Sequence, residues 1–315
     1  MLSPDLMFRK DNSMLSKSLL IGALSLVLFQ AASSADPIVY VVSAGLTGSG
    51  QVGTVDLATG AYSQIGPTEP DGYFGLATGP NGTLLAGTYA ANLDSIDPTT
   101  GNFARVGSTG LGGCVVPTPS CGANSFGTLG GLAGTIYATD FGNNLYTVNP
   151  STAAATLLNG NTGIPAIPFV PSSLNPDGTI NFYDEAIWSS GGGLYATFDA
   201  QIFDLNTFMT VSVVVAPELY RIDPSTGVAT AIGPTDLGIG AVTDVNGVSY
   251  AFNDLTNQIS TIDLSTGNTT FMSNFDPAAG VIQGAATPVP EPSSLALAAI
   301  GLVGLGFFGR WKRQL

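Results

Sequence analysis

The chain has 315 residues, of which 41 are glycine and 20 are proline; 44% of its residues are hydrophobic and only 10% are charged. This composition is too apolar for a disordered acidic chain and too rich in glycine for a helical bundle. The sequence contains no histidine, which excludes a Ser-His-Asp or Cys-His catalytic centre, a histidine-bound zinc ion and a histidine-bound haem.

The charges are distributed unevenly along the chain. Between residues 36 and 287 the basic residues are Arg105 and Arg221, and nearly all of the 22 acidic residues lie in this same body. An anionic body disfavours nucleic acid and anionic membrane surfaces as partners and favours cations. The body has no lysine, which excludes a P-loop, a Schiff base and a pyridoxal site there.

Residues 1–35 have the pattern of a secretory signal peptide. Lys17 precedes an apolar run at 19–29, and Ser33 and Ala35 are the small residues that signal peptidase requires before a cut at Asp36. Met14 is as suitable a start as Met1, because residues 1–13 add nothing to the signal. An uncleaved membrane anchor is the alternative, although the apolar run is short for a span.

One phrase of two strands joined by a tight turn recurs five times in the body. Its aligned turn residues are Asp56, Asp97, Asn149, Asp223 and Asp263. An Asp or Asn side chain accepts hydrogen bonds from backbone N–H groups of such a turn, and a glycine four residues later supplies a positive φ. We therefore interpret these residues as turn formers rather than metal ligands. The third unit has Ala153 in place of that glycine, which predicts a strained or altered turn.

Two further strands precede each phrase, so each unit predicts a four-stranded meander that must stack on its neighbours to bury its faces. The body opens at 39–43 with a second-type strand and closes at 280–286 with a first-type strand, and these two complete one blade. The sequence thus predicts an all-β, five-bladed β-propeller over residues 36–287, closed by pairing of its N- and C-terminal strands. The repeat style resembles bacterial propellers with YVTN-like or quinoprotein-like repeats, a resemblance of architecture that implies no activity.

Three insertions interrupt the repeat, at 112–125, 159–184 and 200–217, and the meander topology places all three on one face of the ring. Residues 210–215 of the third predict an added strand. The first contains Cys114 and Cys121, which are expected to form a disulfide in an exported protein and to stabilise it by roughly 2–3 kcal/mol.

Asp140, Asp199 and Asp254 follow the second strand in three blades, on the same face as the insertions. Oxygen ligands without histidine suit Ca²⁺, so these aspartates are our candidate metal ligands. If they converge on one ion, they support a Ca²⁺-dependent hydrolase or lactonase-like enzyme; otherwise they are solvated acids. We identify no catalytic residue beyond this candidate.

Residues 288–315 contain three parts in a fixed order. Pro290, Glu291 and Pro292 are followed by an apolar run at 295–309 and by the basic residues Arg310, Lys312 and Arg313. The run predicts a transmembrane helix, and the basic cluster places the C-terminus in the cytoplasm, with the body outside. An ordinary anchor with a proline-rich stalk has the same topology.

The order of these three parts resembles the PEP-CTERM sorting signal of Gram-negative bacteria. This resemblance implies that exosortase, a transpeptidase-like membrane enzyme, reads the tripeptide, and it implies an association with exopolysaccharide and biofilm. We expect a precursor anchored in the inner membrane and then a protein at the cell surface or outside the cell. The leading functional hypothesis is a non-enzymatic binding or structural module whose partner is exopolysaccharide, a surface protein or Ca²⁺.

Overall fold

The computed structural model describes residues 37–44, 49–114, 121–166, 175–204, 206–207 and 209–287. The predicted signal peptide, transmembrane helix and sorting segment lie outside the described residues. The strands of the described residues all lie between Ile38 and Ala286.

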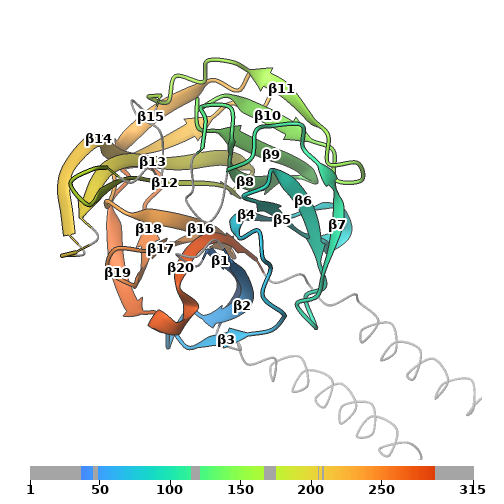
Figure 1. The fold of residues 1–315 in the computed structure, drawn as a ribbon, viewed down its shortest axis with the longest axis horizontal. Coiled ribbons are helices and arrows are strands. Elements are labelled where there is room, and N and C mark those ends of the chain that lie inside the picture. The colour runs from blue at the N-terminus through green and yellow to red at the C-terminus, as the bar shows by residue number, and fades with distance from the viewer. Residues whose placement is uncertain are drawn as a thin grey trace, which may run out of the picture. The chain divides into compact units, whose positions relative to one another are not determined.

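Five four-stranded antiparallel sheets stand around a common axis, as Figure 1 shows in a view along it. The closing blade contains β20 (Val281–Ala286), β1 (Ile38–Ala44), β2 (Gly50–Asp56) and β3 (Tyr62–Gln64). Blade two contains β4 (Tyr73–Thr78), β5 (Leu84–Thr88), β6 (Asn92–Ile96) and β7 (Phe103–Ser108). Blade three contains β8 (Phe126–Leu132), β9 (Thr135–Asp140), β10 (Leu145–Val148) and β11 (Ala155–Asn159). Blade four contains β12 (Thr179–Ser190), β13 (Gly193–Asp204), β14 (Met209–Ile222) and β15 (Ala229–Pro234). Blade five contains β16 (Ile239–Val245), β17 (Val248–Asn253), β18 (Gln258–Ile262) and β19 (Thr269–Asn274), and two short 3₁₀ turns are η1 (Pro80–Gly82) and η2 (Pro277–Ala279).

The prediction of a five-bladed propeller is confirmed, including the way in which the ring closes. β1 pairs antiparallel with β20, so that Tyr40 lies opposite Ala286 and Ala44 lies opposite Val281. The first and last strands of the body thereby share one sheet. Because each blade is an antiparallel meander, the first-to-second and third-to-fourth strand turns lie on one face, which we call the turn face. The other connections lie on the opposite face, which we call the insertion face.

The five innermost strands approach one another closely because several positions lack a side chain. A Cβ atom on Gly284 of β20 would lie 2.4 Å from the amide nitrogen of Leu76 in β4. Likewise, a Cβ on Gly130 of β8 would lie 2.4 Å from the carbonyl oxygen of Ile187 in β12. Glycine inside a strand commonly marks such backbone contact. The result is a narrow central channel.

The hydrophobic core is divided into layers between neighbouring blades. Val39, Val41 and Val55 of the closing blade pack with Phe252 and Phe275 from the end of the ring. A larger layer joins blades two, three and four. Each blade therefore has two buried faces, which explains the apolar character of its strands.

The five repeated turns have the expected hydrogen bonds. Asp223 Oδ1 accepts from the backbone N–H of Ser225 at 2.8 Å, and Asn149 Oδ1 accepts from that of Ser151 at 2.9 Å. In the third unit Ala153 has a φ of +66°, and its N–H still donates to the Asn149 carbonyl at 2.8 Å. The turn is therefore strained at an alanine, as expected, but its geometry is unaltered.

The insertions behave in two different ways. Residues 179–184 and 200–217 are largely strand, since they lengthen β12, β13 and β14 beyond the blade, and the added strand expected at 210–215 is part of β14. The first insertion contains the predicted Cys114–Cys121 disulfide. Residues 115–120 and 167–174 lie outside the described residues.

Candidate functional site

A buried carboxylate pair lies where the channel meets the insertion face. Asp184 of β12 and Asp199 of β13 are direct partners in the strand register, and each is 2% exposed. Gln201 Nε2 donates to Asp184 Oδ2 at 3.4 Å, and the Gly238 N–H donates to Asp199 Oδ2 at 2.8 Å. The Oδ1 atoms of both aspartates have no hydrogen-bond partner among the described residues.

Burial controls the ionisation of this pair. It raises the pKa of Asp184 well above its usual value, and the charges of Asp199 and Asp254 raise it further. Burial also raises the pKa of Asp199 to about 7, against the hydrogen bond from Gly238. Neighbouring Glu185 has its pKa raised to about 8, mainly by burial. The site therefore holds protons at pH values where exposed carboxyl groups are ionised.

Two of the three candidate metal ligands lie in this region. Asp199 belongs to the pair, and Asp254 follows β17, where its Oδ1 accepts from the Ile282 N–H of β20 at 2.9 Å. Asp199 thus links blade four to blade five, and Asp254 links blade five to the closing strand.

Asp140, the third candidate, accepts hydrogen bonds from the turn that follows β9. Its Oδ1 accepts from the N–H groups of Gly142 and Asn144, and its Oδ2 accepts from the Asn144 amide and the Tyr146 hydroxyl. Within the described residues, no group of three acidic or cysteine side chains is arranged to hold a metal ion. The arrangement therefore gives no support to a shared ion on Asp140, Asp199 and Asp254, and Ca²⁺ binding stays a prediction.

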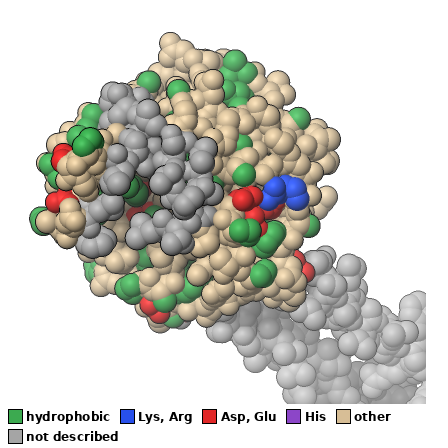
Figure 2. All heavy atoms as spheres, viewed as in Figure 1, with side chains coloured by type: hydrophobic (Ala, Val, Ile, Leu, Met, Phe, Trp, Pro, Cys, Tyr) green, Lys and Arg blue, Asp and Glu red, His purple; other side chains and the backbone are tan. Residues whose placement is uncertain are grey.

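A second acidic group surrounds Arg105 at the junction of the closing blade and blade two. Arg105 Nε donates to the fully buried Asp94, and its Nη2 lies 3.3 Å from Asp71 and 3.5 Å from Glu69. Burial raises the pKa of both Asp94 and Glu69, and Arg105 opposes the shift. On the face seen in Figure 2, charged side chains are few, and a basic patch lies directly beside acidic ones. This cluster stabilises a blade junction rather than forming an open site.

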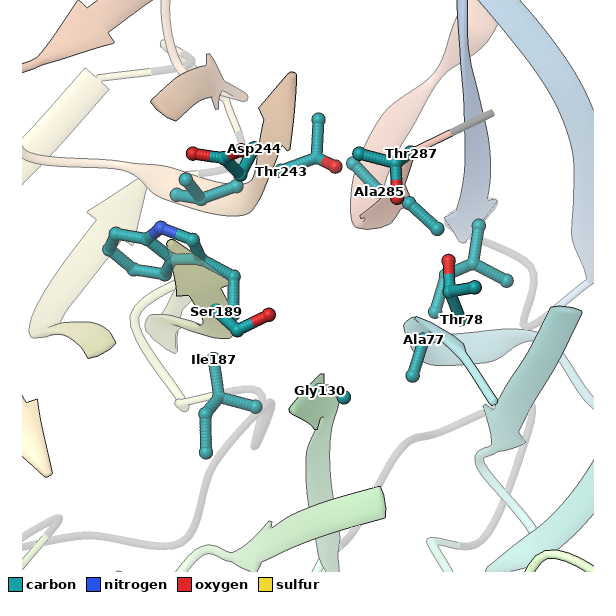
Figure 3. A pocket seen from close by; sticks show the side chains of 14 residues that line it. Ala77, Thr78, Gly130, Ile187, Ser189, Thr243, Asp244, Ala285 and Thr287 are labelled. Atoms are coloured by element: carbon teal, nitrogen blue, oxygen red, sulfur yellow. The ribbon is translucent and has the colours of Figure 1, made fainter. Parts of the chain in front are cut away.

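A second candidate site is a cavity at the turn-face end of the ring. A cavity of about 180 Å³ lies between the ends of all five innermost strands, and its labelled side chains surround an open space in Figure 3. Four of the lining residues are Thr78, Ser189, Thr243 and Thr287, which carry hydroxyl groups; Thr78 Oγ1 is buried and has no hydrogen-bond partner among the described residues. Asp244 also lines it, but its oxygens already accept from Ser190 Oγ and the Gly247 N–H. None of the described residues that line this cavity is a lysine or an arginine.

Beneath this cavity, side chains of the innermost strands fill most of the central channel. Deeper in the ring, Leu76, Leu129, Ile187, Val242 and Ala285 surround a space of about 10 Å³. Such a space holds at most one water molecule. The hydroxyl-lined cavity and the carboxylate pair are therefore separate sites at opposite ends of the ring.

The last described residue is Thr287, at the rim of this cavity, and the proline-rich segment begins at the next residue. Residues 288–313 match the model of the PEP-CTERM protein-sorting motif. This segment is a PEP-CTERM sorting motif. The PEP-CTERM tripeptide Pro290, Glu291 and Pro292, and the basic residues Arg310, Lys312 and Arg313, lie outside the described residues. The part of the chain that the structure describes contains no helix with the length and apolarity of a membrane span.

Comparisons of the whole PEP-CTERM chain add little about its activity. No curated protein matches it. A nidogen/laminin complex has 12% identity and a TM-score of 0.45, over 79% of this chain and 97% of the other. The PQQ-bound aldose sugar dehydrogenase of Streptomyces coelicolor has 16% identity and a TM-score of 0.40, over 60% and 59%. The virginiamycin B lyase of Staphylococcus aureus has 11% identity and a TM-score of 0.35, over 73% and 83%. Similarity at this level says nothing about what the present chain binds.

The sequence predicted one end of the ring better than the other. Asp199 was a candidate ligand and Asp184 was expected on the same face, at the end of an insertion, but the pairing of the two was not predicted. The two lie at equal distances from the Gly191–Gly192 turn, so counting outward from that turn pairs them. The group of hydroxyl-bearing residues was missed, although Thr78, Ser189, Thr243 and Thr287 all lie within two residues of the end of a first-type strand.

Proposed function

We propose that this chain is the precursor of an exported β-propeller that exosortase processes at Pro290–Pro292 and that then acts at the cell surface as a non-enzymatic binding module for exopolysaccharide. Signal peptidase removes residues 1–35, and the apolar run at 295–309 anchors the precursor in the inner membrane until it is processed. The PEP-CTERM motif supports the sorting part of this proposal.

The hydroxyl-lined cavity supports the second part of the proposal, the binding of exopolysaccharide. The hydroxyl groups of Ser189, Thr243 and Thr287 can donate and accept hydrogen bonds, and none of the described residues that line the cavity carries a basic side chain that would attract an anion. The edges of the five innermost strands add backbone N–H and C=O groups to the wall. A cavity of about 180 Å³ is smaller than a drug-sized pocket and suits one small, uncharged, hydroxyl-rich unit, such as a sugar residue of a polymer.

The test is a binding titration of the processed protein against the exopolysaccharide of its host and a panel of neutral oligosaccharides. We expect Thr243→Val and Ser189→Ala to weaken binding, because each removes a hydroxyl group from the cavity. Thr256→Val removes an exposed hydroxyl from the insertion face and is the matched control. If no sugar is retained, or if all three variants bind like the wild type, the cavity is not the glycan site.

The buried carboxylate pair is the basis of an alternative proposal, in which the protein is a Ca²⁺-dependent hydrolase or a lactonase-like enzyme. The observation that favours it is the burial of Asp184 and Asp199, which raises the pKa of both carboxyl groups, as is common among acid–base catalysts. Hydrolysis that is lost in Asp184→Asn and Asp199→Asn but retained in Thr243→Val would favour this alternative.

A further inference from the structure

The place where the chain leaves the ring after β20 determines which face of the propeller lies toward the membrane in an anchored precursor. β20 runs toward the turn face and ends at Ala286, and Thr287 lines the cavity at the centre of that face. The tail therefore leaves close to the axis of the ring. At the start of the body, β1 begins at Ile38 next to the end of β20, since Tyr40 lies opposite Ala286.

The segment between Thr287 and the apolar run at 295–309 is too short for the insertion face to lie against the membrane. Pro290 is three residues beyond Thr287, so its Cα lies within roughly 11 Å of that of Thr287. The apolar run begins at residue 295, eight residues beyond Thr287, which is at most about 29 Å of extended chain. Three of these eight residues are proline, which restricts the backbone further. An enzyme that reads Pro290–Pro292 must therefore act within roughly 11–18 Å of Thr287 at the turn face.

We propose that in the anchored precursor the turn face is the surface presented to the membrane and to the processing enzyme, while the insertion face points away from both. This inference rests on the membrane-anchored precursor of the proposed function. Processing then frees the central cavity, while the insertion face, with its disulfide loop, is accessible throughout.

The electrostatics of the turn face indicate the kind of surface that it meets. Asp97, Asp223 and Asp263 are exposed there, and hydrogen bonds within their turns lower the pKa of each carboxyl group. The face is thus anionic at neutral pH and is repelled by anionic headgroups.

The test compares two single cysteines in the full-length chain. Ser225→Cys lies in a repeated turn on the turn face, and Ala278→Cys lies in η2 on the insertion face. Both positions are exposed, and at each the backbone N–H donates to an aspartate two residues earlier, at 2.8 and 2.9 Å. The described cysteines are joined in a disulfide and do not compete for the reagent. The chain is produced in a host without the processing enzyme, and spheroplasts are treated with a large, impermeant maleimide-polyethylene glycol.

We expect Ser225→Cys to react severalfold more slowly than Ala278→Cys. A flexible linker of about 20 Gly and Ser residues between Thr287 and Pro288 adds an average reach of roughly 25 Å and should abolish the difference. Equal rates without the linker, in a precursor that sediments with the membrane, would overturn the proposed orientation. A precursor that does not sediment with the membrane would instead overturn the anchoring on which the inference rests.

Discussion

Asp184 on β12 and Asp199 on β13 lie directly opposite each other in the strand register, and both are buried. The folded protein holds protons on this pair that the unfolded chain releases, because the pKa of an exposed aspartate is about 3.9. A raised pKa in the folded state contributes stability that is complete below the unfolded value and is lost as the pH rises through the folded value. We therefore expect the free energy of unfolding to fall between about pH 4 and pH 8.

This pH dependence should be measured by denaturant unfolding at several pH values in that range. Asp184→Asn and Asp199→Asn keep the shape of the side chains and remove two of the titrating groups, so the double variant should have a smaller slope; Glu185 keeps its own contribution. Asp204→Asn at an exposed turn, where hydrogen bonds lower the pKa, removes the same charge and is the control. A profile that keeps its full slope in the double variant would contradict this assignment of the protons.

Arg105 is expected to matter more at high than at low pH. Arg105→Met leaves the buried Asp94 and Glu69 without a cation, a change that costs on the order of 3 kcal/mol when the carboxyl groups are ionised. At pH 5 the cost should be smaller, because burial favours their protonation. Arg221→Met removes the other basic residue of the body, which is exposed, and should change stability by less than about 0.5 kcal/mol. Similar losses in both variants would indicate a general charge effect.

The same position of the repeated turn is a glycine in blade two, Gly101, and an alanine in blade three, Ala153, so the two can be compared. Gly101 has a φ of +65°, and a Cβ there would lie 2.4 Å from the carbonyl oxygen of Ile65. Gly101→Ala should therefore destabilise the protein by roughly 2–4 kcal/mol. Ala153→Gly relieves a left-handed alanine but removes a buried methyl group, and these effects nearly cancel. Thermal unfolding of both variants checks this, and a large loss in Ala153→Gly would show that the methyl packing dominates.

The disulfide is expected to have a moderate, global effect. Cys114→Ala together with Cys121→Ala opens a loop of sequence separation 7, and in the chain-entropy model this costs roughly 2–3 kcal/mol. The unfolding midpoint of the double variant should match that of the wild type measured under reducing conditions. A clear difference between the two would mean that the alanines disturb packing, since Cys121 is fully buried.

The sequence predicted the ring because its repeat is local. Asp223, Gly227 and their counterparts encode a turn within five residues, and the two half-blades at the ends of the body encode the closure. Contacts between blades were not predictable in this way. The bond from Gly238 to Asp199 and the grouping of Glu69, Asp94 and Arg105 depend on how separate sheets are rotated about the axis. No repeat position carries that information.

The pairing of β1 with β20 also determines when the ring can close during folding. The first strand of the body stays without its inner neighbour until the last strand has been synthesised and delivered. That last strand ends one residue before the sorting segment begins. In the export route proposed above, the ring therefore remains open for almost the entire passage of the chain and closes only when its last strand has crossed.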